Sequence, residues 1–494
     1  MAKRVAIVDI GSNSARVVIY QRTSRFGFHL IAQQKASVRI SEGSFENDGI
    51  LQPKAIERAL RALKTFKNII DEYKARKTII IATAAVRNAP NRYEFISLVK
   101  KETGLKIKVI DGNKEAFLGA VAAKNLLPIN QDISITVDIG GGSTDIALIK
   151  NENIVSTVSL NIGTITLKEL FFDKNRDINE AKEFINQEFK KIPNDIKEAN
   201  YAVAIGGILR AFAKSIIEIS NYSYKKIHAF EYNINDYKNH IEEIINTKDI
   251  NKLKKLKIKE NRFDTIREGL VIFSELLKYL NISRVITSGV GVREGVFLND
   301  MLRSVGGKFP KELNPSIVSI RDRLDILGIP TKQKEKISKN LYSLLKDTIS
   351  TKCDYSKELQ YAMKLSNIGK TLNIYDEHKH TYYLASNELN WQLTHRQMLL
   401  IAAILRSKGE KLIYKAIKKE HKELLPNKKT LKWLGLIYTM GNLLYEYAPK
   451  AKFEFKYENN TLSIISNCDL YLFKEEIKDI QLPKELKLDI IDSI

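Results

Sequence analysis

The chain has 494 residues, which is too long for a single hydrophobic core, so we expect two to four domains. Hydrophobic residues make up 44% of it and charged residues 28%, a balance that is typical of folded soluble proteins and excludes a disordered chain. Two cysteines, Cys353 and Cys468, are too few for a disulfide-rich extracellular scaffold. We see no apolar run of membrane-spanning length and no signal-peptide pattern, so we expect a cytoplasmic protein.

The net charge of +22 is unevenly distributed along the chain. Residues 1–100 carry 18 basic and 8 acidic side chains, and residues 251–450 carry 37 and 20, whereas residues 101–250 carry 19 and 21. Two basic regions around a neutral one favour a groove for an extended anion, although lysine used only for solubility is an alternative. No basic run is interleaved with aromatic residues, so nucleic acid is the weaker partner hypothesis. No membrane partner is expected.

The first 300 residues show alternating strand and helix patterns. We expect a strand, a tight turn and a strand over 4–20, a helix over 53–76, a strand over 78–87 that runs into a loop, a strand over 105–112 and a helix over 113–127. From residue 133 the pattern restarts with another strand, glycine turn and strand, followed by helices and by strand-plus-turn segments at 201–207 and 283–295. This alternation predicts α/β architecture.

The pattern changes to mainly helical after about residue 300. The segments "KISKNLYSLLKDTI", "ELQYAMKLSNIGK" and "RQMLLIAAILRSKGEKLIYKAIKK" have helical spacing of apolar residues. Near the end, "KFEFKYENNTLSIIS" predicts a β-hairpin that turns at Asn459 and Asn460, because asparagine tolerates the positive φ of tight hairpin turns.

The chain contains one Asp-Ile-Gly turn twice, as "AIVDIGSNSARVVIY" (6–20) and "TVDIGGGSTDIALI" (136–149). Glycines directly after a strand let the backbone N–H groups approach a phosphate, and the aspartates at the strand ends can hold Mg²⁺ or orient water. A single such turn can reflect hairpin geometry alone. Two copies, each with its aspartate, predict two similar domains that grip one phosphate between them.

The paired turns resemble those of the actin/Hsp70/sugar-kinase superfamily. Within it, five segments in order resemble the exopolyphosphatase/guanosine pentaphosphate phosphohydrolase (Ppx/GppA) family: "DIGSNSARVVIY", "ATAAVRNAPN", "GNKEAFLGAVA", "VDIGGGSTDIAL" and "SGVGVREGVF". The resemblance implies two actin-like (ribonuclease H-like) α/β domains that arose by duplication. We place them at residues 1–124 and 125–300, followed by a C-terminal, mainly helical HD-like domain at 301–494.

The resemblance also implies the residues of a phosphate site with Mg²⁺ as cofactor. The first phosphate loop comprises Asp9, Gly11, Ser12, Asn13, Ser14 and Arg16. The second comprises Asp138, Gly140, Gly141, Gly142, Ser143 and Thr144. Gly206 and Gly207 are added as further substrate contacts. The implied metal ligands are Asp9, Asp138 and Glu115.

The implied catalytic residues are Glu115, Arg87 and Asp138. Hydrolysis needs a base to orient and deprotonate the attacking water, and Glu115 holds the position of that base. Arg87 is the expected phosphate cation, acting directly or through a neighbour. Outside this motif, a glutamate that begins a helix more often stabilises the helix dipole, and an arginine after a strand more often makes a surface ion pair.

Several positions depart from the family pattern. Lys114 stands where relatives commonly have a second acid, Asp145 where they have glutamate, and Ile208 where threonine is usual. In the segment "YAMKLSNIGKTLNIYDEHKHTYYLASN" (361–387), Ser366 and Asn367 hold the two positions that are metal ligands in HD-like domains. Neutral serine and asparagine cannot replace histidine and aspartate there, so we expect no second active site.

His378 and His380 lie in the same segment. Two roles are open for them: a contact to an anion, or an ordinary structural one.

The expected activity is removal of the terminal phosphate from inorganic polyphosphate, from guanosine pentaphosphate (pppGpp), or from both. The alternative is a catalytically weak regulator that binds polyphosphate, pppGpp or guanosine tetraphosphate without efficient cleavage. Phosphate release from each substrate would distinguish the two. A homodimer is left open by the sequence.

Overall fold

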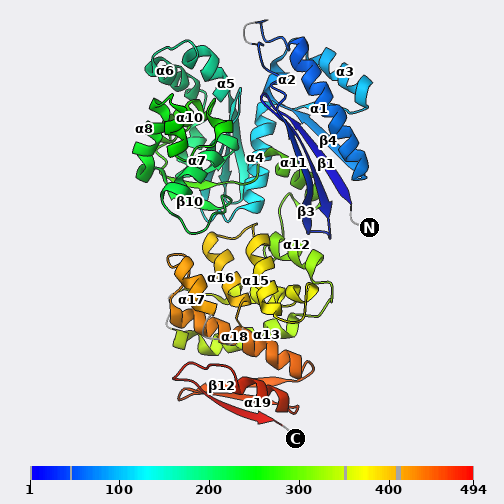
Figure 1. Cartoon of the computed structure of the whole chain (residues 1–494), viewed down its shortest axis with the longest axis vertical. Coiled ribbons are helices and arrows are strands. Elements are labelled where there is room, and N and C mark those ends of the chain that lie inside the picture. The colour runs from blue at the N-terminus through cyan, green and yellow to red at the C-terminus, as the bar shows by residue number, and fades with distance from the viewer. Residues whose placement is uncertain (1–2, 45–46, 350–352, 408–412, 493–494) are drawn as a thin grey trace. The chain divides into compact units, whose positions relative to one another are not determined.

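The computed structural model describes residues 3–44, 47–349, 353–407 and 413–492 (Figure 1). Its contacts divide the chain into two compact units, Met1–Glu312 and Leu313–Ile494. The first unit holds two mixed sheets, and the second holds helices and a small sheet. The mixed α/β architecture predicted from the sequence is confirmed for the first unit.

The first sheet has the strand order β3-β2-β1-β4-β5. Its strands are β1 (Arg4–Ile10), β2 (Ala15–Arg22), β3 (Phe28–Ala36), β4 (Lys77–Ala82) and β5 (Ile107–Val109). Strand β1 pairs antiparallel with β2 and parallel with β4, so the first phosphate loop is the tight connection between two central strands. Helices α1 (Pro53–Glu72) and α3 (Arg92–Thr103) pack on this sheet and on each other.

The second sheet repeats this plan and adds one strand, in the order β10-β11-β9-β6-β7-β8. Its strands are β6 (Ile133–Ile139), β7 (Thr144–Lys150), β8 (Asn153–Leu160), β9 (Tyr201–Ile205), β10 (Phe230–Asn233) and β11 (Arg284–Thr287). The β6–β7 hairpin corresponds to β1–β2, and in both sheets the first strand has a parallel neighbour on its other side. The two predicted loops therefore occupy equivalent places in two similar sheets.

The helices of the second half of this unit surround the second sheet. They are α5 (Thr164–Leu167), α6 (Ile178–Phe189), α7 (Gly207–Ile219), α8 (Lys238–Asn246), α9 (Ile250–Lys255) and α10 (Ile266–Tyr279). Their apolar faces, with β6, β7, β9 and β11, form one continuous hydrophobic core. Burial of this core holds the glycine turns at the strand ends in place.

Helices α4 (Gly112–Leu126) and α11 (Val292–Met301) pack closely against each other. A Cβ atom at Gly295 would overlap the backbone of Leu118, so only glycine permits this approach. Helix α4 also packs on β6, β7 and β8, whereas α11 contacts β1. The helix predicted over 113–127 is confirmed, and the domain boundary after residue 124 stays a prediction.

One local expectation was wrong. The strand predicted over 78–87 ends at Ala82, and the segment that follows is the short helix α2 (Ala84–Asn88) instead of a loop. Thr83 is extended, and its carbonyl oxygen accepts a hydrogen bond from the N–H of Arg87 at 2.9 Å. This turn of helix fixes where Arg87 leaves the backbone.

The second unit contains eight helices and the sheet β12-β13-β14 in its described part. The helices are α12 (Pro315–Leu324), α13 (Lys332–Ile349), α14 (Ser356–Leu365), α15 (Glu377–Glu388), α16 (His395–Leu405), α17 (Ile413–Glu420), α18 (Lys428–Tyr447) and α19 (Tyr471–Lys478). The strands are β12 (Phe453–Glu458), β13 (Thr461–Ser466) and β14 (Lys487–Asp492). The predicted helical character is confirmed; the HD-like assignment stays a prediction.

The predicted late hairpin is confirmed as β12–β13. Asn459 and Asn460 form its turn with φ values of 49° and 62°, the conformation for which asparagine is favoured. Part of the long helical segment predicted around residue 408 lies outside the described residues, and α16 and α17 account for the rest.

Within the described chain, no helix has both the length and the apolar character needed to cross a membrane.

Candidate functional site

A cleft of about 200 Å³ lies in the first unit where the two glycine turns meet. A Cβ atom at Gly141 would be 3.1 Å from Cβ of Ser12, so the two turns are in van der Waals contact. Most predicted site residues line this cleft: Asp9, Gly11, Ser12, Asn13, Ser14, Arg16, Glu115, Asp138, Gly140, Gly141, Gly142, Ser143, Gly206 and Gly207. The structure thus brings together residues from four separate segments of the sequence.

Each turn is closed by one equivalent backbone hydrogen bond. The N–H of Gly11 donates to the carbonyl of Ser14 at 3.1 Å, and the N–H of Gly140 donates to that of Ser143 at 2.8 Å. The second turn is further supported by Gly163, where a Cβ atom would overlap the backbone of Gly141. This close approach makes the glycine at 163 necessary.

Two predicted site residues do not line the cleft. The hydroxyl of Thr144 donates to the carbonyl of Ile162 at 2.7 Å, so it is engaged in the fold of the second turn. Arg87 instead contacts Glu115, the expected base: its Nη1 lies 3.1 Å from Oε2 of Glu115 and also donates to the carbonyl of Ile110 at 3.1 Å. Arg87 therefore does not line the cleft itself and influences it through its contact with Glu115.

Glu115 is placed by the first turn of α4. The side chain of Asp111 caps this helix by accepting a hydrogen bond from the N–H of Lys114 at 2.7 Å. Gly112 packs directly on Ser159 of β8, and a Cβ atom there would overlap that serine. The absence of a side chain at 112 thus brings Glu115 close to the second sheet and its buried Asp145.

Burial and mutual repulsion raise the pKa values of the acids around the cleft. For Glu115 the pKa lies well above its usual value, first because of burial and then because of the nearby Asp145, with Arg87 acting in the opposite direction. Burial raises the pKa of Asp145 to about 7, although Ser159 and Ser143 donate hydrogen bonds to it. Burial also raises the pKa of Asp138 to about 6. Such perturbed carboxylates in a cleft are typical of catalytic sites.

Four cations in the cleft were missed by the sequence reasoning: Lys35, Arg210, Arg262 and Arg293. With Arg16 they place five basic side chains around one cavity. Burial, together with the neighbouring arginines, lowers the pKa of Arg16 to about 10. The sequence contains features that could have identified two of them as site residues: Arg293 lies in the motif "SGVGVREGVF", and Arg210 follows Gly207 within one helical turn.

Arg293 and Asp9 form an ion pair across the cleft wall. Nη1 of Arg293 lies 3.5 Å from Oδ2 of Asp9. Glu294 holds the loop behind Arg293, because its Oε2 accepts from the N–H of Gly291 at 2.8 Å and its Oε1 accepts from the hydroxyl of Tyr20 at 2.5 Å. The position of this arginine is therefore set by two strands of the first sheet, β1 and β2, and by the loop that precedes α11.

The acids are consistent with a bound Mg²⁺. Asp9 and Asp138 both line the cleft, and the charge of Asp9 raises the pKa of Asp138, a repulsion that a divalent cation would relieve. In the described part of the chain, no three acidic, histidine or cysteine side chains surround a metal on their own. Mg²⁺ commonly takes one or two carboxylates and completes its shell with phosphate oxygens and water, so this donor set fits.

Taken together, these groups can bind a polyanion and activate water. Five cations and two glycine turns suit phosphate oxygens, and Glu115 offers a carboxylate of raised pKa at the wall of the cleft. No nucleophilic serine, threonine or cysteine that contacts a histidine base lines the cleft among the described residues. The arrangement suits in-line attack by water on a phosphate group.

Comparisons with known proteins agree with this chemistry. The model of the Ppx/GppA phosphatase family matches residues 18–304. The chain is 27% identical over 402 residues to a guanosine-5'-triphosphate,3'-diphosphate pyrophosphatase of Pseudoalteromonas translucida, covering 77% of this chain and 76% of that one. It is 30% identical over 298 residues to a bifunctional 3-dehydroquinate synthase/phosphatase of Fusobacterium nucleatum, covering 57% of this chain and 44% of that relative, so it spans less than half of the latter's length.

Solved structures show the same fold. A crystal structure of the Aquifex aeolicus member of the Ppx/GppA protein family matches with a TM-score of 0.53 and 28% identity, covering 62% of this chain and 99% of that one. An exopolyphosphatase from Cytophaga hutchinsonii matches with a TM-score of 0.53 at 22% identity, covering 62% of this chain and all of that one. The second similarity is one of fold alone.

Proposed function

Because the chain belongs to the Ppx/GppA phosphatase family, we propose that its cleft removes the terminal phosphate from a linear phosphoanhydride. The substrates are inorganic polyphosphate, guanosine pentaphosphate, or both. The name of the Pseudoalteromonas relative supports the nucleotide. The five cations of the cleft and the basic regions of the chain support a longer anion as well.

The observation that carries this proposal is the position of Glu115. Its carboxylate lines a cavity with five basic side chains, and its other contact is the guanidinium of Arg87, which stays out of the cavity. A base in this setting can accept a proton from water while the cations neutralise the phosphate that the water attacks. Arg87 orients Glu115, and its charge lowers the pKa that burial raises, which favours the deprotonated form that a base needs.

The other residues of the cleft bind and orient the substrate. In the proposal, the N–H groups of the two glycine turns that do not close those turns, with the hydroxyl of Ser12 and the backbone N–H of Ser143, hold the terminal phosphate. The Ser143 hydroxyl donates to Asp145. Arg293 and Arg16 neutralise the charge of the phosphate. Asp9 and Asp138 hold Mg²⁺, which as a Lewis acid would stabilise the charge that develops on the phosphate oxygens. Arg210, Arg262 and Lys35 contact phosphates further along the chain.

The decisive experiment measures phosphate release from a long polyphosphate and from pppGpp, with Mg²⁺, for the wild type and Glu115→Gln. The substitution keeps volume and hydrogen bonding but removes the base, so we expect a loss of roughly 10²- to 10⁴-fold in turnover with binding retained. The matched control is Lys114→Gln, which alters the adjacent, partly buried position of the same helix. Turnover of Glu115→Gln within a few-fold of the wild type would refute the role of Glu115.

The same assay addresses the alternative of a binding regulator. Tight binding of either anion by the wild-type protein, with phosphate release no faster than in a reaction without protein, would establish the regulator instead. The departure from the family pattern at Ile208, which lines the cleft, is a feature of the cleft that this alternative would cite, whereas Glu115, Asp138 and both glycine turns favour the hydrolase.

A further inference from the structure

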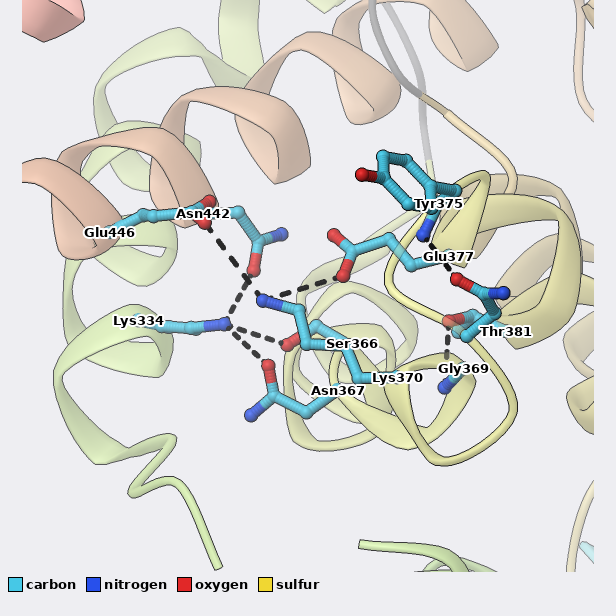
Figure 2. Close-up of polar contacts among 11 residues, drawn as sticks. Lys334, Ser366, Asn367, Gly369, Lys370, Tyr375, Glu377, Thr381, Asn442 and Glu446 are labelled. Carbon is cyan, nitrogen blue, oxygen red and sulfur yellow. Dashed lines mark hydrogen bonds and ion pairs between the residues drawn. The ribbon is translucent and has the colours of Figure 1, made fainter. Parts of the chain in front are cut away.

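A lysine lies at the polar centre of the second unit. Lys334, in α13, is buried, with 5% of its surface exposed. Figure 2 shows its ammonium surrounded by side chains from the end of α14 and from α18. Nζ lies 2.9 Å from Oδ1 of Asn442, 3.0 Å from Oδ1 of Asn367 and 3.2 Å from Oγ of Ser366. An ammonium has three N–H donors, so these oxygens satisfy it completely.

The surrounding amides are oriented as acceptors for this cation. Nδ2 of Asn442 donates to the carbonyl of Tyr438 at 3.0 Å, which turns Oδ1 toward Lys334. Asn367 is 2% exposed, and its Nδ2 has no hydrogen-bond partner among the described residues. In this orientation the Asn367 amide leaves its buried N–H donors unsatisfied, but its oxygen accepts a hydrogen bond from a charged ammonium. The charge-assisted hydrogen bond is the stronger of the two interactions, so the orientation with the oxygen toward Lys334 is favoured.

Charged groups outside this shell support a cation at its centre. Burial lowers the pKa of Lys334 to about 8, which keeps the side chain mostly protonated at pH 7. Glu446, Glu377 and Asp325 act in favour of the charged form, and Lys370 acts against it. Lys370 itself is paired with Glu377 at 3.4 Å and with Glu446 at 3.9 Å, so its own charge is largely compensated (Figure 2).

We propose that the ammonium of Lys334 is a built-in cation that fills the place of a metal ion in the second unit. Two of its three acceptors, Ser366 and Asn367, hold the positions where the sequence resemblance implies metal ligands. Neutral oxygens around a single positive charge replace charged ligands around a divalent metal, so the centre keeps an internal cation and loses its metal dependence. This inference does not depend on the proposed phosphatase activity.

The experiment follows the unfolding of the second unit in the full chain. Both tryptophans, Trp391 and Trp433, lie in this unit, so their fluorescence reports on it alone. Lys334→Met removes the charge but keeps a long side chain, and it leaves the oxygens of Ser366, Asn367 and Asn442 without this donor. We expect the thermal midpoint to fall by about 5 °C or more. The matched control is Lys336→Met, an exposed position on the same helix, which should shift it little.

A second variant tests whether the side chain of Lys334 is charged. In Asn367→Asp a carboxylate replaces the amide next to the ammonium, and no hydrogen bond is lost within the described part of the chain, where Nδ2 has no partner. If Lys334 is charged, Asn367→Asp keeps or raises the midpoint in the wild-type background and lowers it strongly in the Lys334→Met background. If the two substitutions act additively, the proposal is overturned. Where Lys334→Met folds poorly, a fall of the midpoint for Asn367→Asp in the wild-type background overturns it instead.

Metal dependence gives the remaining test. The wild-type midpoint should be the same after dialysis against EDTA and after addition of Mn²⁺ or Zn²⁺. A midpoint that falls with the chelator and recovers with the metal would mean that a metal, and not Lys334, fills the centre. Equal midpoints for Lys334→Met and Lys336→Met would refute the proposal as well.

Discussion

Nη1 of Arg87 and Oε2 of Glu115 lie 3.1 Å apart, and only the glutamate reaches the cleft. The arginine was expected to act as a phosphate cation, directly or through a neighbour, and the structure places it behind the base. Both side chains are largely buried, with 17% and 14% of their surfaces exposed, so this pair is not a screened surface contact. The positive charge of Arg87 therefore influences the pKa of Glu115.

Replacement of Arg87 should therefore change the pH dependence of the reaction. Its charge lowers the pKa of Glu115, so Arg87→Met should raise that pKa and move the acidic limb of the pH–rate profile to higher pH. We expect a loss on the order of 10- to 100-fold at pH 7, partly from disordered positioning of the base. Recovery of turnover at alkaline pH is the distinctive result. Arg61→Met, at an exposed position, is the control, and an unchanged pH profile would contradict this role of Arg87.

Asp145 should lower the stability of the folded protein at neutral pH. Its pKa is raised to about 7 in the folded state, so the folded protein binds a proton more tightly than the unfolded one, and stability falls as pH rises from about 4 to about 7. Asp145→Asn removes this loss, so we expect the variant to gain on the order of 2–4 kcal/mol over the wild type at pH 8 and little at pH 4.

The measurement is thermal or urea unfolding of the first unit by circular dichroism at both pH values. Asp132→Asn, at an exposed site directly before β6, should show no such pH-dependent gain. A gain for Asp145→Asn that is equal at pH 4 and pH 8 would show that the titration of Asp145 is not its source.

Asp138 should be required for Mg²⁺-dependent turnover. One of its oxygens faces Gly206, where a Cβ atom would be 2.5 Å away, so this loop glycine leaves room for the carboxylate. Asp138→Asn removes one of two carboxylates that fit Mg²⁺, and we expect phosphate release to fall to near background at any Mg²⁺ concentration. A titration of Mg²⁺ against the wild type is the reference. Full wild-type activity in excess EDTA would exclude this role.

The basic regions should make polyphosphate binding sensitive to salt. If residues 1–100 and 251–450 contact many phosphates, KM for a long polyphosphate should rise steeply with ionic strength through counterion release, as for nucleic-acid backbones. Guanosine pentaphosphate is short and contacts only the cleft, so its KM should rise less with ionic strength than the KM for polyphosphate. KM values for both substrates across a salt series give the two slopes. Equal shallow slopes would mean that the excess lysines serve solubility only.

The repeated turns were predictable because their chemistry is local. Asp9 and Asp138 each precede glycines at the end of an apolar run, and both the strand and the turn follow from those few residues. The late hairpin at Asn459 was predictable for the same reason. The resemblance then supplied the role of Glu115, which its own sequence surroundings would not distinguish from a helix-capping acid.

The cations of the cleft were harder to predict because they depend on tertiary contacts. Arg262 and Lys35 lie outside any motif, and only the packing of the two sheets brings them to one cavity. The short helix that carries Arg87 was missed because a strand ending in "ATAAVR" has no strong helix signal within five residues. Lys334 is one of many lysines in a basic segment, and nothing in the local sequence marks it as buried.

The contact between α4 and α11 has a mechanical consequence. Gly295 of α11 lies against the backbone of Leu118 in α4, and the two helices carry Glu115 and Arg293 near their starts. Because no side chain separates the helices at this crossing, they cannot slide past each other without a backbone clash. Any opening of the cleft must move the base and the arginine as one body, so substrate entry has to be accommodated by the glycine turns and the loops that face this helix pair.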